Sequence, residues 1–419
     1  MLGSGPPAGR PDGVVDTTAG DPLWVAGLFL GPVSSYEPMS SLRFLLRTIA
    51  VVSFAARALF AGPFERSVPM AEPGPFLLWD TSLTLRSGGG HTDNPTYAPS
   101  FREPSGFMAL GADLLILRLP SDGNSGYLFF TGDDRRFFSA PSVRKEQTFA
   151  TQGLLKHEWT DWTGTLTAQH LYADQVFDLS EEGSGTNAPV QGHVQASGHT
   201  LGIRPALRRS LGDGGWIEGE VGLARQYFSE PLDSSGERSM KLTLGRLYAP
   251  KCSLELALAG SLRLYDDSAL LAADGSYLAG TREELATRAI EGIWRHAWDA
   301  KDRWRTVLRG SASRVEDNGQ GYFDHDTLSA SAQVQFESGR WTAKLTGKFV
   351  RYTYAVQQVS PPGSGARARD EVTAEAKLEY RLRPQLKCVA IVSEERSLGN
   401  SAFDTYSART VSAGLEWDL

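Results

Sequence analysis

The C-terminal stretch TVSAGLEWDL, residues 410–419, alternates strictly between polar and apolar side chains. Strict alternation is typical of a β-strand, because successive side chains of a strand point to opposite faces of its sheet. In a soluble sandwich the apolar face points into a core, whereas in a membrane barrel it points at lipid. The fold therefore depends on which face of such strands is inside. The apolar residues of this stretch are Val411, Ala413, Leu415, Trp417 and Leu419.

The same alternation recurs along most of the chain after about residue 76. In DEVTAEAKLEYRLRP, residues 370–384, the apolar face begins at Val372 and the polar face begins at Glu371. A helix would scatter this apolar set around its circumference, so the run is predicted to be a strand. Counting such runs predicts about sixteen strands (14–18), near 76–86, 106–119, 125–136, 146–160, 162–178, 194–210, 215–228, 237–249, 252–265, 284–298, 302–316, 322–337, 340–356, 369–383, 386–396 and 406–419.

The connections between these runs alternate in length. Short ones, such as GDGG at 212–215 and ESGR at 337–340, follow even-numbered runs, and long ones, such as 266–284, follow odd-numbered runs. Short turns at one end and long loops at the other are typical of an up-and-down transmembrane barrel. The polar faces are also too charged for the dry interior of a sandwich. The sequence therefore predicts an all-β, antiparallel transmembrane β-barrel whose apolar faces contact lipid and whose polar faces line a lumen.

Most tryptophans lie at strand ends beside the short turns or at the C-terminus. Indole combines a flat apolar body with one N–H donor, so it prefers the level of the bilayer interface. Tryptophans that filled a soluble core would be scattered along the strands instead. The predicted aromatic girdle consists of Trp159, Trp162, Trp216, Trp298, Trp304, Trp341 and Trp417.

Composition excludes several classes of function. The formal charge of −7 and the pI near 5.6 argue against a nucleic-acid binder. No run after residue 65 reaches the roughly 18 consecutive apolar residues of a spanning helix, so a membrane would be crossed by strands. Cys252 and Cys388 stand in no metal-like or redox spacing and are interpreted as apolar positions, with a disulfide as the alternative. The sequence predicts no metal and no cofactor.

The start of the chain differs from the rest. Residues 39–61 resemble a secretory signal peptide, because Arg43 and Arg47 precede a short apolar stretch that is followed by small residues. Two alternatives stay open: residues 22–33 are a signal core of their own, or the stretch beside Arg57 is an inner-membrane anchor. The predicted division is a misassigned extension at 1–38, the signal peptide at 39–61, an N-terminal periplasmic segment at 62–75 and the barrel at 76–419.

The signal, the alternating strands and the final strand together resemble Gram-negative outer-membrane β-barrels of the porin-like kind. In that family the last strand usually ends in Phe, whereas this chain has Leu419 there and an aromatic residue, Trp417, two positions earlier. The resemblance covers nearly the whole mature chain, but it is one of pattern. It implies location in the bacterial outer membrane and contact with outer-membrane lipids, lipopolysaccharide and the barrel-assembly machinery. By analogy with sixteen-stranded porins, it also implies a possible homo-oligomer.

Charged residues recur on the polar faces of several runs. Opposed ladders of charge inside a barrel can set ion selectivity and position a solute. They can equally be structural pairs that fix the strand register, each worth little in contact with water. Both interpretations stay open for any single residue. The predicted lumen-lining charges are Lys344, Lys348, Glu375, Lys377, Glu379, Arg305, Arg309, Arg204 and Arg208.

Catalytic chemistry has weak support in the sequence. The seven histidines form no HExxH pair, and no Gly-x-Ser-x-Gly elbow is present. A barrel enzyme would need Ser with His, or Asp with His, near the outer rim. Candidates for such a pair are His325 with Asp324 and Asp326, in FDHD at 323–326, and His91 with Asp93. A chance loop histidine is the commoner explanation, so no catalytic residue is predicted.

The long connection at 266–284 is more apolar than a solvated loop needs, because it contains Leu270, Leu271, Tyr277 and Leu278. Two interpretations stay open. The loop folds against the barrel mouth and narrows it, or it forms a small hydrophobic cap on the neighbouring loops.

These observations predict a channel for passive diffusion of small hydrophilic solutes or ions, because a barrel of about sixteen strands leaves an aqueous passage unless it is plugged. The first alternative is a non-conducting barrel that serves as a surface anchor or as an export or assembly partner. The second is a barrel enzyme that acts on envelope lipids.

Overall fold

The computed structural model describes residues 79–99, 102–178, 193–359, 365–401 and 404–419. The predicted signal peptide and the segments on either side of it lie outside these residues. No helix long and apolar enough to cross a membrane occurs in the described part of the chain.

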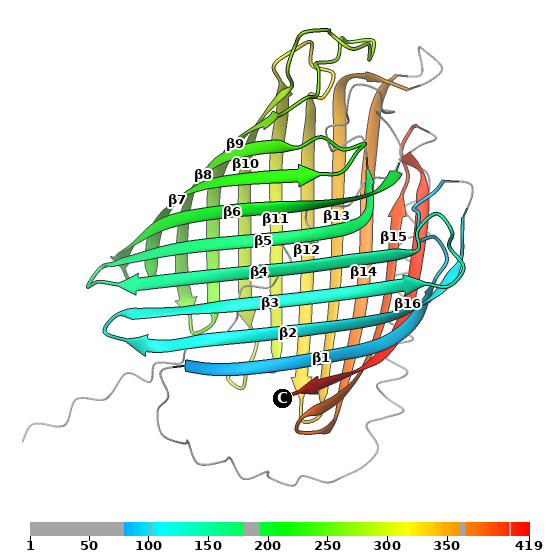
Figure 1. Ribbon diagram of the computed structural model, residues 1–419. Coiled ribbons are helices and arrows are strands. Elements are labelled where there is room, and N and C mark those ends of the chain that lie inside the picture. The colour runs from blue at the N-terminus through cyan, green and yellow to red at the C-terminus, as the bar shows by residue number, and fades with distance from the viewer. Residues whose placement is uncertain (1–78, 100–101, 179–192, 360–364, 402–403) are drawn as a thin grey trace, which may run out of the picture. The chain divides into compact units, whose positions relative to one another are not determined.

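Sixteen β-strands make up the described structure, as the alternation predicts (Figure 1). They are β1 (Trp79–Thr92), β2 (Ser105–Ser121), β3 (Asn124–Phe137), β4 (Lys145–Glu158), β5 (Trp162–Asp178), β6 (His193–Gly212), β7 (Gly215–Phe228), β8 (Ser235–Ala249), β9 (Cys252–Tyr265), β10 (Glu284–Ala297), β11 (Trp304–Asp317), β12 (His325–Ser338), β13 (Trp341–Gln358), β14 (Ala366–Arg383), β15 (Leu386–Ser397) and β16 (Tyr406–Asp418).

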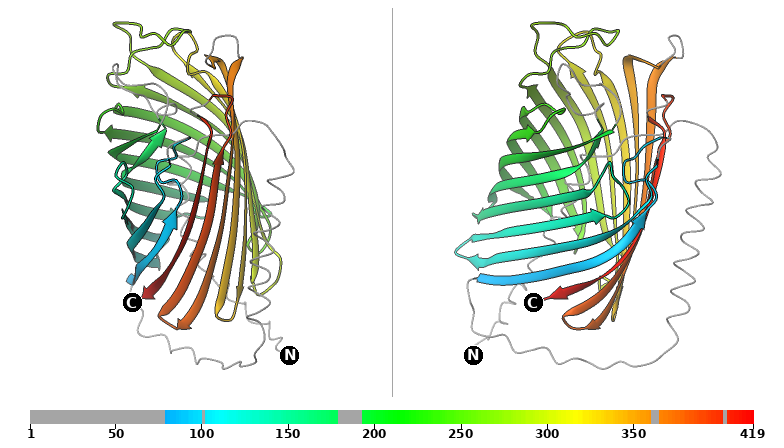
Figure 2. Two further views of the ribbon diagram at one scale, coloured as in Figure 1. Left: turned by 90° about the vertical axis from the view of Figure 1, so that its right-hand side faces the viewer. Right: turned by 45° about the vertical axis from the view of Figure 1, so that its right-hand side comes forward.

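Every strand pairs antiparallel with its neighbours in sequence, and β1 pairs with β16 to close the sheet into a barrel (Figure 2). The seam between β1 and β16 runs from Thr84 opposite Asp418 to Thr92 opposite Thr410. The predicted class, an all-β up-and-down barrel, is therefore confirmed. Closure leaves no lateral sheet edge along the seam, which is the condition for placing a sheet in lipid.

Turn chemistry explains why one end of the barrel is compact. Between β6 and β7, Asp213 and Gly214 both have positive φ (46° and 74°), the conformation of a tight two-residue hairpin. The opposite end carries the long connections, among them residues 266–283 between β9 and β10 (Figure 1). The barrel therefore has one end of short turns, here called the turn end, and one end of long loops, here called the loop end.

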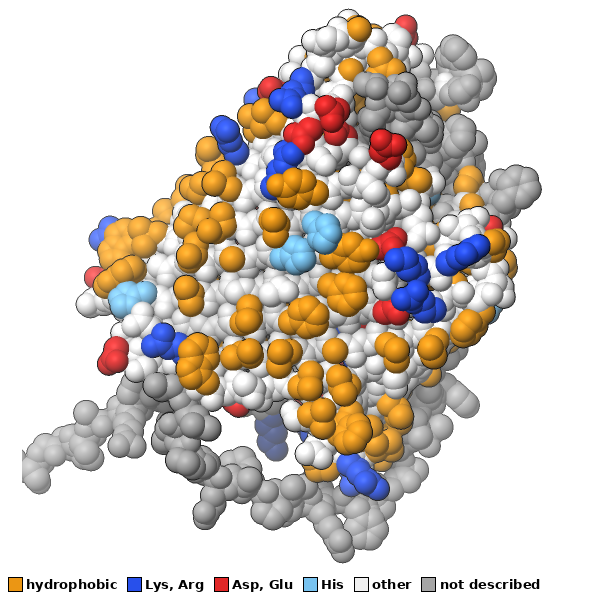
Figure 3. Space-filling model, in the orientation of Figure 1, with side chains coloured by type: hydrophobic (Ala, Val, Ile, Leu, Met, Phe, Trp, Pro, Cys, Tyr) orange, Lys and Arg blue, Asp and Glu red, His pale blue; other side chains and the backbone are white. Residues whose placement is uncertain are grey.

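The apolar faces of the strands point outward. On β9, Leu254, Leu256 and Leu258 are each more than half exposed, whereas Ala257 on the other face is 5% exposed. Figure 3 shows apolar side chains spread over the face of the barrel that is in view. An apolar outer surface and a polar inner surface are the reverse of a soluble sandwich.

The first strand is longer than its predicted range of 76–86. It begins at Trp79 and continues through three glycines to Thr92. The glycines and the two residues after them belong to the strand because they pair with both β2 and β16. The backbones approach closely here: a Cβ added at Gly90 would lie 2.3 Å from the Val411 carbonyl oxygen. What reads as a glycine-rich loop is therefore a strand that only glycine fits.

We expect the Gly90→Ala variant to weaken barrel closure by about 1–3 kcal/mol, because the new methyl group must displace β16 or the Phe107 ring. The urea midpoint of unfolding in detergent measures the loss. Gly347→Ala on β13 is the matched control, since a Cβ there meets nothing within 4 Å. Equal midpoints for the two variants would contradict the close approach.

Candidate functional site

The inward face of the barrel carries the charged residues singled out in the sequence. On β13 and β14, Lys344 is opposite Lys377, and the outward Leu345 and Ala376 form the next pair. The same alternation places the remaining predicted charges inward, on the face opposite the exposed leucines. These are Lys348 on β13, Glu375 and Glu379 on β14, Arg305 and Arg309 on β11, and Arg204 and Arg208 on β6.

Several of these inward charges are paired along the wall. Arg208 Nε lies 2.8 Å from Glu218 of β7. Lys377 Nζ lies 2.7 Å from Glu379 and 3.2 Å from Glu416 of β16. Such pairs across neighbouring strands help to fix the register, and each adds little to stability where water reaches it.

The two lysines of β13 are arranged differently. Within the described residues, no ion pair includes Lys344 or Lys348, although Lys348 lies close enough to Glu395 to influence it electrostatically. The inward side chains also keep contact with solvent: 45% of the Arg208 side chain and 26% of the Lys377 side chain are exposed. The inner wall therefore carries hydrated charges. Neighbouring carboxylates neutralise some of them, such as Arg208 and Lys377, but not Lys344 and Lys348 among the described residues.

An aromatic contact crosses the barrel near the loop end, and the sequence analysis did not predict it. Tyr406 of β16 and His193 of β6 pack edge to face at 5.3 Å between ring centroids, although β1 to β5 separate their strands in the sheet. Tyr97, from the connection between β1 and β2, packs on both rings. The negative charge of Glu395, together with burial, raises the pKa of Tyr97 well above its ordinary value. This contact brings opposite walls together.

Two buried arginines extend this packed region along β14. Arg367 donates from Nε to Asp404 at 2.7 Å and lies 4.7 Å above the Tyr354 ring. Arg369 lies 4.6 Å above the Tyr352 ring. Both arginines are 1% exposed. The sequence signal was the alternation of ARARD at the start of β14, which puts two arginines on the polar face.

The tryptophans divide between the two faces. Trp159, Trp162, Trp298, Trp304 and Trp417 are exposed at the turn end or close to the C-terminus, and Trp341 stands beside them against Tyr380. Trp216 is a correction, since it is 8% exposed and packs under Arg208 inside the barrel. The parity of β7 explains the difference, because Trp216 shares a face with Glu218 and not with the exposed Val221.

Exposed tryptophans at one end of a barrel are the arrangement expected of an interface belt. The closed barrel, its even strand number, its unequal ends and its apolar outer band make the chain an outer-membrane β-barrel, located in the bacterial outer membrane.

Within the described part of the chain, neither candidate histidine forms a hydrogen bond with its neighbouring aspartates. His325 faces inward, and its Nδ1 lies 2.8 Å from the Phe323 carbonyl. Its neighbour Asp326 faces outward toward Arg314, and Asp324 accepts a hydrogen bond from the Asp317 backbone. At the other position, Asp93 accepts from the Arg409 backbone N–H at 2.7 Å. Within the described residues, no group of three or more His, Cys, Asp or Glu side chains is placed to hold a metal ion.

The apolar residues of the connection between β9 and β10 pack on the neighbouring loop. Leu271 forms a buried cluster with Tyr322 and Phe323 of the connection between β11 and β12. The arrangement corresponds to the cap interpretation of this loop. At its end, Glu283 is 2% exposed, and burial together with the charges of Asp317 and Asp233 raises its pKa to about 8.

No protein-family model matches the chain, and no curated protein matches it. Solved structures with similar backbones include Pseudomonas putida OprB, at 10% identity and a TM-score of 0.44, covering 81% of this chain and 94% of that one. Pseudomonas aeruginosa OpdQ shares 11% identity with a TM-score of 0.44, covering 81% and 98%. Acinetobacter baumannii OccAB3 shares 9% identity with a TM-score of 0.39, covering 81% and 99%. At these scores the fold assignment rests on the strand pairing of the chain itself.

The cap loop should open as the pH rises. The Glu283 carboxyl has a pKa of about 8 in the packed loop and its ordinary pKa of 4.5 in the open loop, so the packed loop holds the proton more tightly. As the pH rises from 4.5 to about 8, the open loop loses this proton first, and the free energy that favours packing decreases. Above that range both states have lost the proton, and the free energy of packing is constant. The loss is about 1.4 kcal/mol per pH unit inside that window. We therefore expect chymotrypsin cleavage after Tyr277, relative to Glu283→Gln, to increase about tenfold or more between pH 6 and 8.5. Equal ratios at both pH values would contradict this.

Proposed function

We propose that this outer-membrane barrel is a channel for passive diffusion of small hydrophilic solutes or ions. The observation that supports it best is the inward wall, where charged side chains such as Arg208 and Lys377 remain accessible to water. A sixteen-stranded barrel is wide enough for an aqueous passage. Such passage needs no covalent chemistry, since solutes are selected by size and charge.

Charge selection would rest on the lysines of β13. A wall charge that a neighbouring carboxylate neutralises adds little to the field along the axis, whereas Lys344 and Lys348 act without an ion-pair partner among the described residues. These two positions should therefore favour anions. Size selection would be set at the loop end, where Tyr97, His193 and Tyr406 occupy part of the cross-section.

The same aromatic contact favours a second candidate function. Because it joins β6 to β16 across the barrel, it supports a barrel that does not conduct and that acts as a surface anchor or an export partner. The two candidates differ in one observable, steady ion conduction by the folded barrel.

Single-channel recording in planar bilayers under a salt gradient tests both. The native barrel should give ohmic steps, and the Lys344→Glu/Lys348→Glu variant should shift the cation-to-anion permeability ratio toward cations by at least about threefold. Reversing one unit charge about 10 Å from an ion in water changes the ion's energy by about 0.8 kcal/mol, before screening by salt.

Arg351→Glu is the matched control, because Arg351 lies on the same strand but on the outward face. It should leave the permeability ratio unchanged. A barrel that migrates as a folded, heat-modifiable band and never conducts would support the second candidate. A conducting barrel whose selectivity ignores both lysines would remove their assigned role.

A further inference from the structure

Two histidines meet on the outer face of the barrel, where many neighbouring side chains are apolar. His170 Nε2 of β5 lies 3.1 Å from His199 Nδ1 of β6, and the two ring planes differ by 14°. Both residues are on the outward face that also carries the exposed Leu166 and Leu201. Figure 3 shows histidine side chains in contact over β5 and β6, beside apolar ones. A polar pair therefore interrupts the apolar outer surface.

Strand pairing fixes the positions of both side chains. Tyr172 is opposite His199, and His170 is opposite Leu201, so the two histidines are diagonal neighbours on adjacent strands. Diagonal side chains on one face of an antiparallel pair are within reach of each other. The other edges of β5 and β6 pair with β4 and β7. The two rings are thus presented by backbones that are hydrogen-bonded on both sides.

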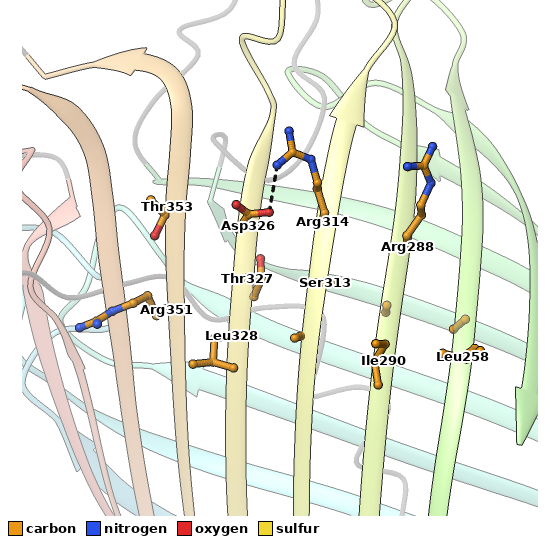
Figure 4. Close-up of a pocket in the computed structure, with 13 residues that line it drawn as sticks. Leu258, Arg288, Ile290, Ser313, Arg314, Asp326, Thr327, Leu328, Arg351 and Thr353 are labelled. Atoms are coloured by element: carbon orange, nitrogen blue, oxygen red, sulfur yellow. Dashed lines mark hydrogen bonds and ion pairs between the residues drawn. The ribbon is translucent and has the colours of Figure 1, made fainter. Parts of the chain in front are cut away.

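Other polar side chains on the outer face have partners of a different kind. Arg314 Nη1 of β11 lies 3.5 Å from Asp326 of β12, as Figure 4 shows. The outward His296 lies 2.9 Å from a tyrosine hydroxyl. Among the described residues, His170 and His199 hydrogen-bond only to each other. Each ring therefore keeps its second nitrogen without a described protein partner.

The pair lies near the loop-end edge of the apolar band. On β5, His170 follows Trp162 of the turn end by eight residues. Eight residues of a strand tilted by about 40° rise about 20 Å, and the apolar band of an outer-membrane barrel is about 25 Å tall. Four residues further along β5, Asp174 forms an ion pair with Lys145 at 2.6 Å on the same outward face. Water and ions from the loop end therefore reach the level of the two rings.

The separation of the two nitrogens suits a shared metal ion. Two imidazole nitrogens at about 2.0–2.1 Å from one ion, at an angle of about 90–110°, lie roughly 2.8–3.4 Å apart. The observed 3.1 Å falls within that range, so an ion can bind after the rings turn, without movement of the strands. In the hydrogen bond one of the two nitrogens carries a proton. On metal binding this proton moves to the other nitrogen of the same ring, so both rings stay neutral.

We infer that His170 and His199 form a binding site for a divalent transition-metal ion of the class of Cu²⁺, Ni²⁺ and Zn²⁺. Imidazole suits these ions, whereas Ca²⁺ and Mg²⁺ need carboxylate or carbonyl oxygens. Tyr172 packs on His199 at 4.9 Å between ring centroids and limits the orientation of that ring. Water fills the remaining coordination positions, because no third His, Cys, Asp or Glu of the described residues joins the pair. This inference does not depend on whether the barrel conducts.

Titration of the folded full chain with Cu²⁺ in a non-ionic detergent, without a histidine tag, tests the site. Electron paramagnetic resonance should report a bound ion with two nitrogen ligands. H170Q and H199Q should each bind Cu²⁺ at least about tenfold more weakly, since the loss of a group that merely orients a ligating histidine already costs about ten- to a hundredfold. H296Q is the matched control, because it removes an outward histidine whose partner is a tyrosine. It should bind as the native barrel does.

A measurement on the native chain covers the case in which a variant does not fold. Saturating Zn²⁺ should protect His170 and His199, but not His296, from modification by diethyl pyrocarbonate, as read by mass spectrometry of the peptides. The inference would be overturned by equal modification of the pair with and without Zn²⁺, by native Cu²⁺ affinity in H170Q or H199Q, or by an equal loss of affinity in H296Q.

Discussion

The structure depends on the cost of an unpaired backbone amide in lipid, which is several kcal/mol for each group. A sheet avoids this cost only if its first and last strands pair with each other. Here β1 pairs with β16 from Thr84 to Thr92. The need for close pairing explains the glycines of β1, because the chain gives up side chains there to bring the backbones together. The division into an apolar outer face and a polar inner face follows from closure, since each strand then has one side toward lipid and one toward the lumen.

Arginine serves three different environments in this barrel. On the inner wall, Arg208 shares its charge with a carboxylate on the next strand and keeps contact with water. Near the loop end, Arg367 is buried, so it needs a hydrogen-bonded carboxylate and an aromatic ring to offset the loss of hydration. On the outer wall, Arg314 stands at the edge of the apolar band. Arginine therefore helps to fix register on the inner wall, joins neighbouring strands near the loop end, and pairs with a carboxylate on the outer wall.

Alternation in the sequence predicts much of this arrangement. The alternation of polar and apolar residues is a local property of each strand. The number of strands, the outward direction of their apolar faces and the inward position of Lys344 could therefore be derived without knowing any distant contact. Trp216 was placed on the outer face because it lies next to a turn. Its position in the alternation gives the correct face, since Trp216 lies two and four residues before Glu218 and Glu220, which face inward. The contact of Tyr97 with Tyr406 and His193 was beyond prediction, because it joins residues that only closure brings together. The outward position of Arg314 and Arg351 also follows from the alternation, although most of their neighbours on that face are apolar.

The connection after β1 also ties the two chain ends of the barrel together. Asn94 donates to the Ser407 carbonyl at 3.0 Å, and the Asp93 carboxylate accepts from the Arg409 backbone, so both fasten this loop to β16 beside the seam. At the opposite end, β16 finishes at the level of Leu83, and β1 extends beyond it to Trp79. Thr84 Oγ1 also donates to Asp418 at 2.8 Å there, so side-chain hydrogen bonds fasten the seam at both of its ends. Under a lateral load, β1 would therefore separate from β16 only after a side-chain hydrogen bond at one of the two ends had broken.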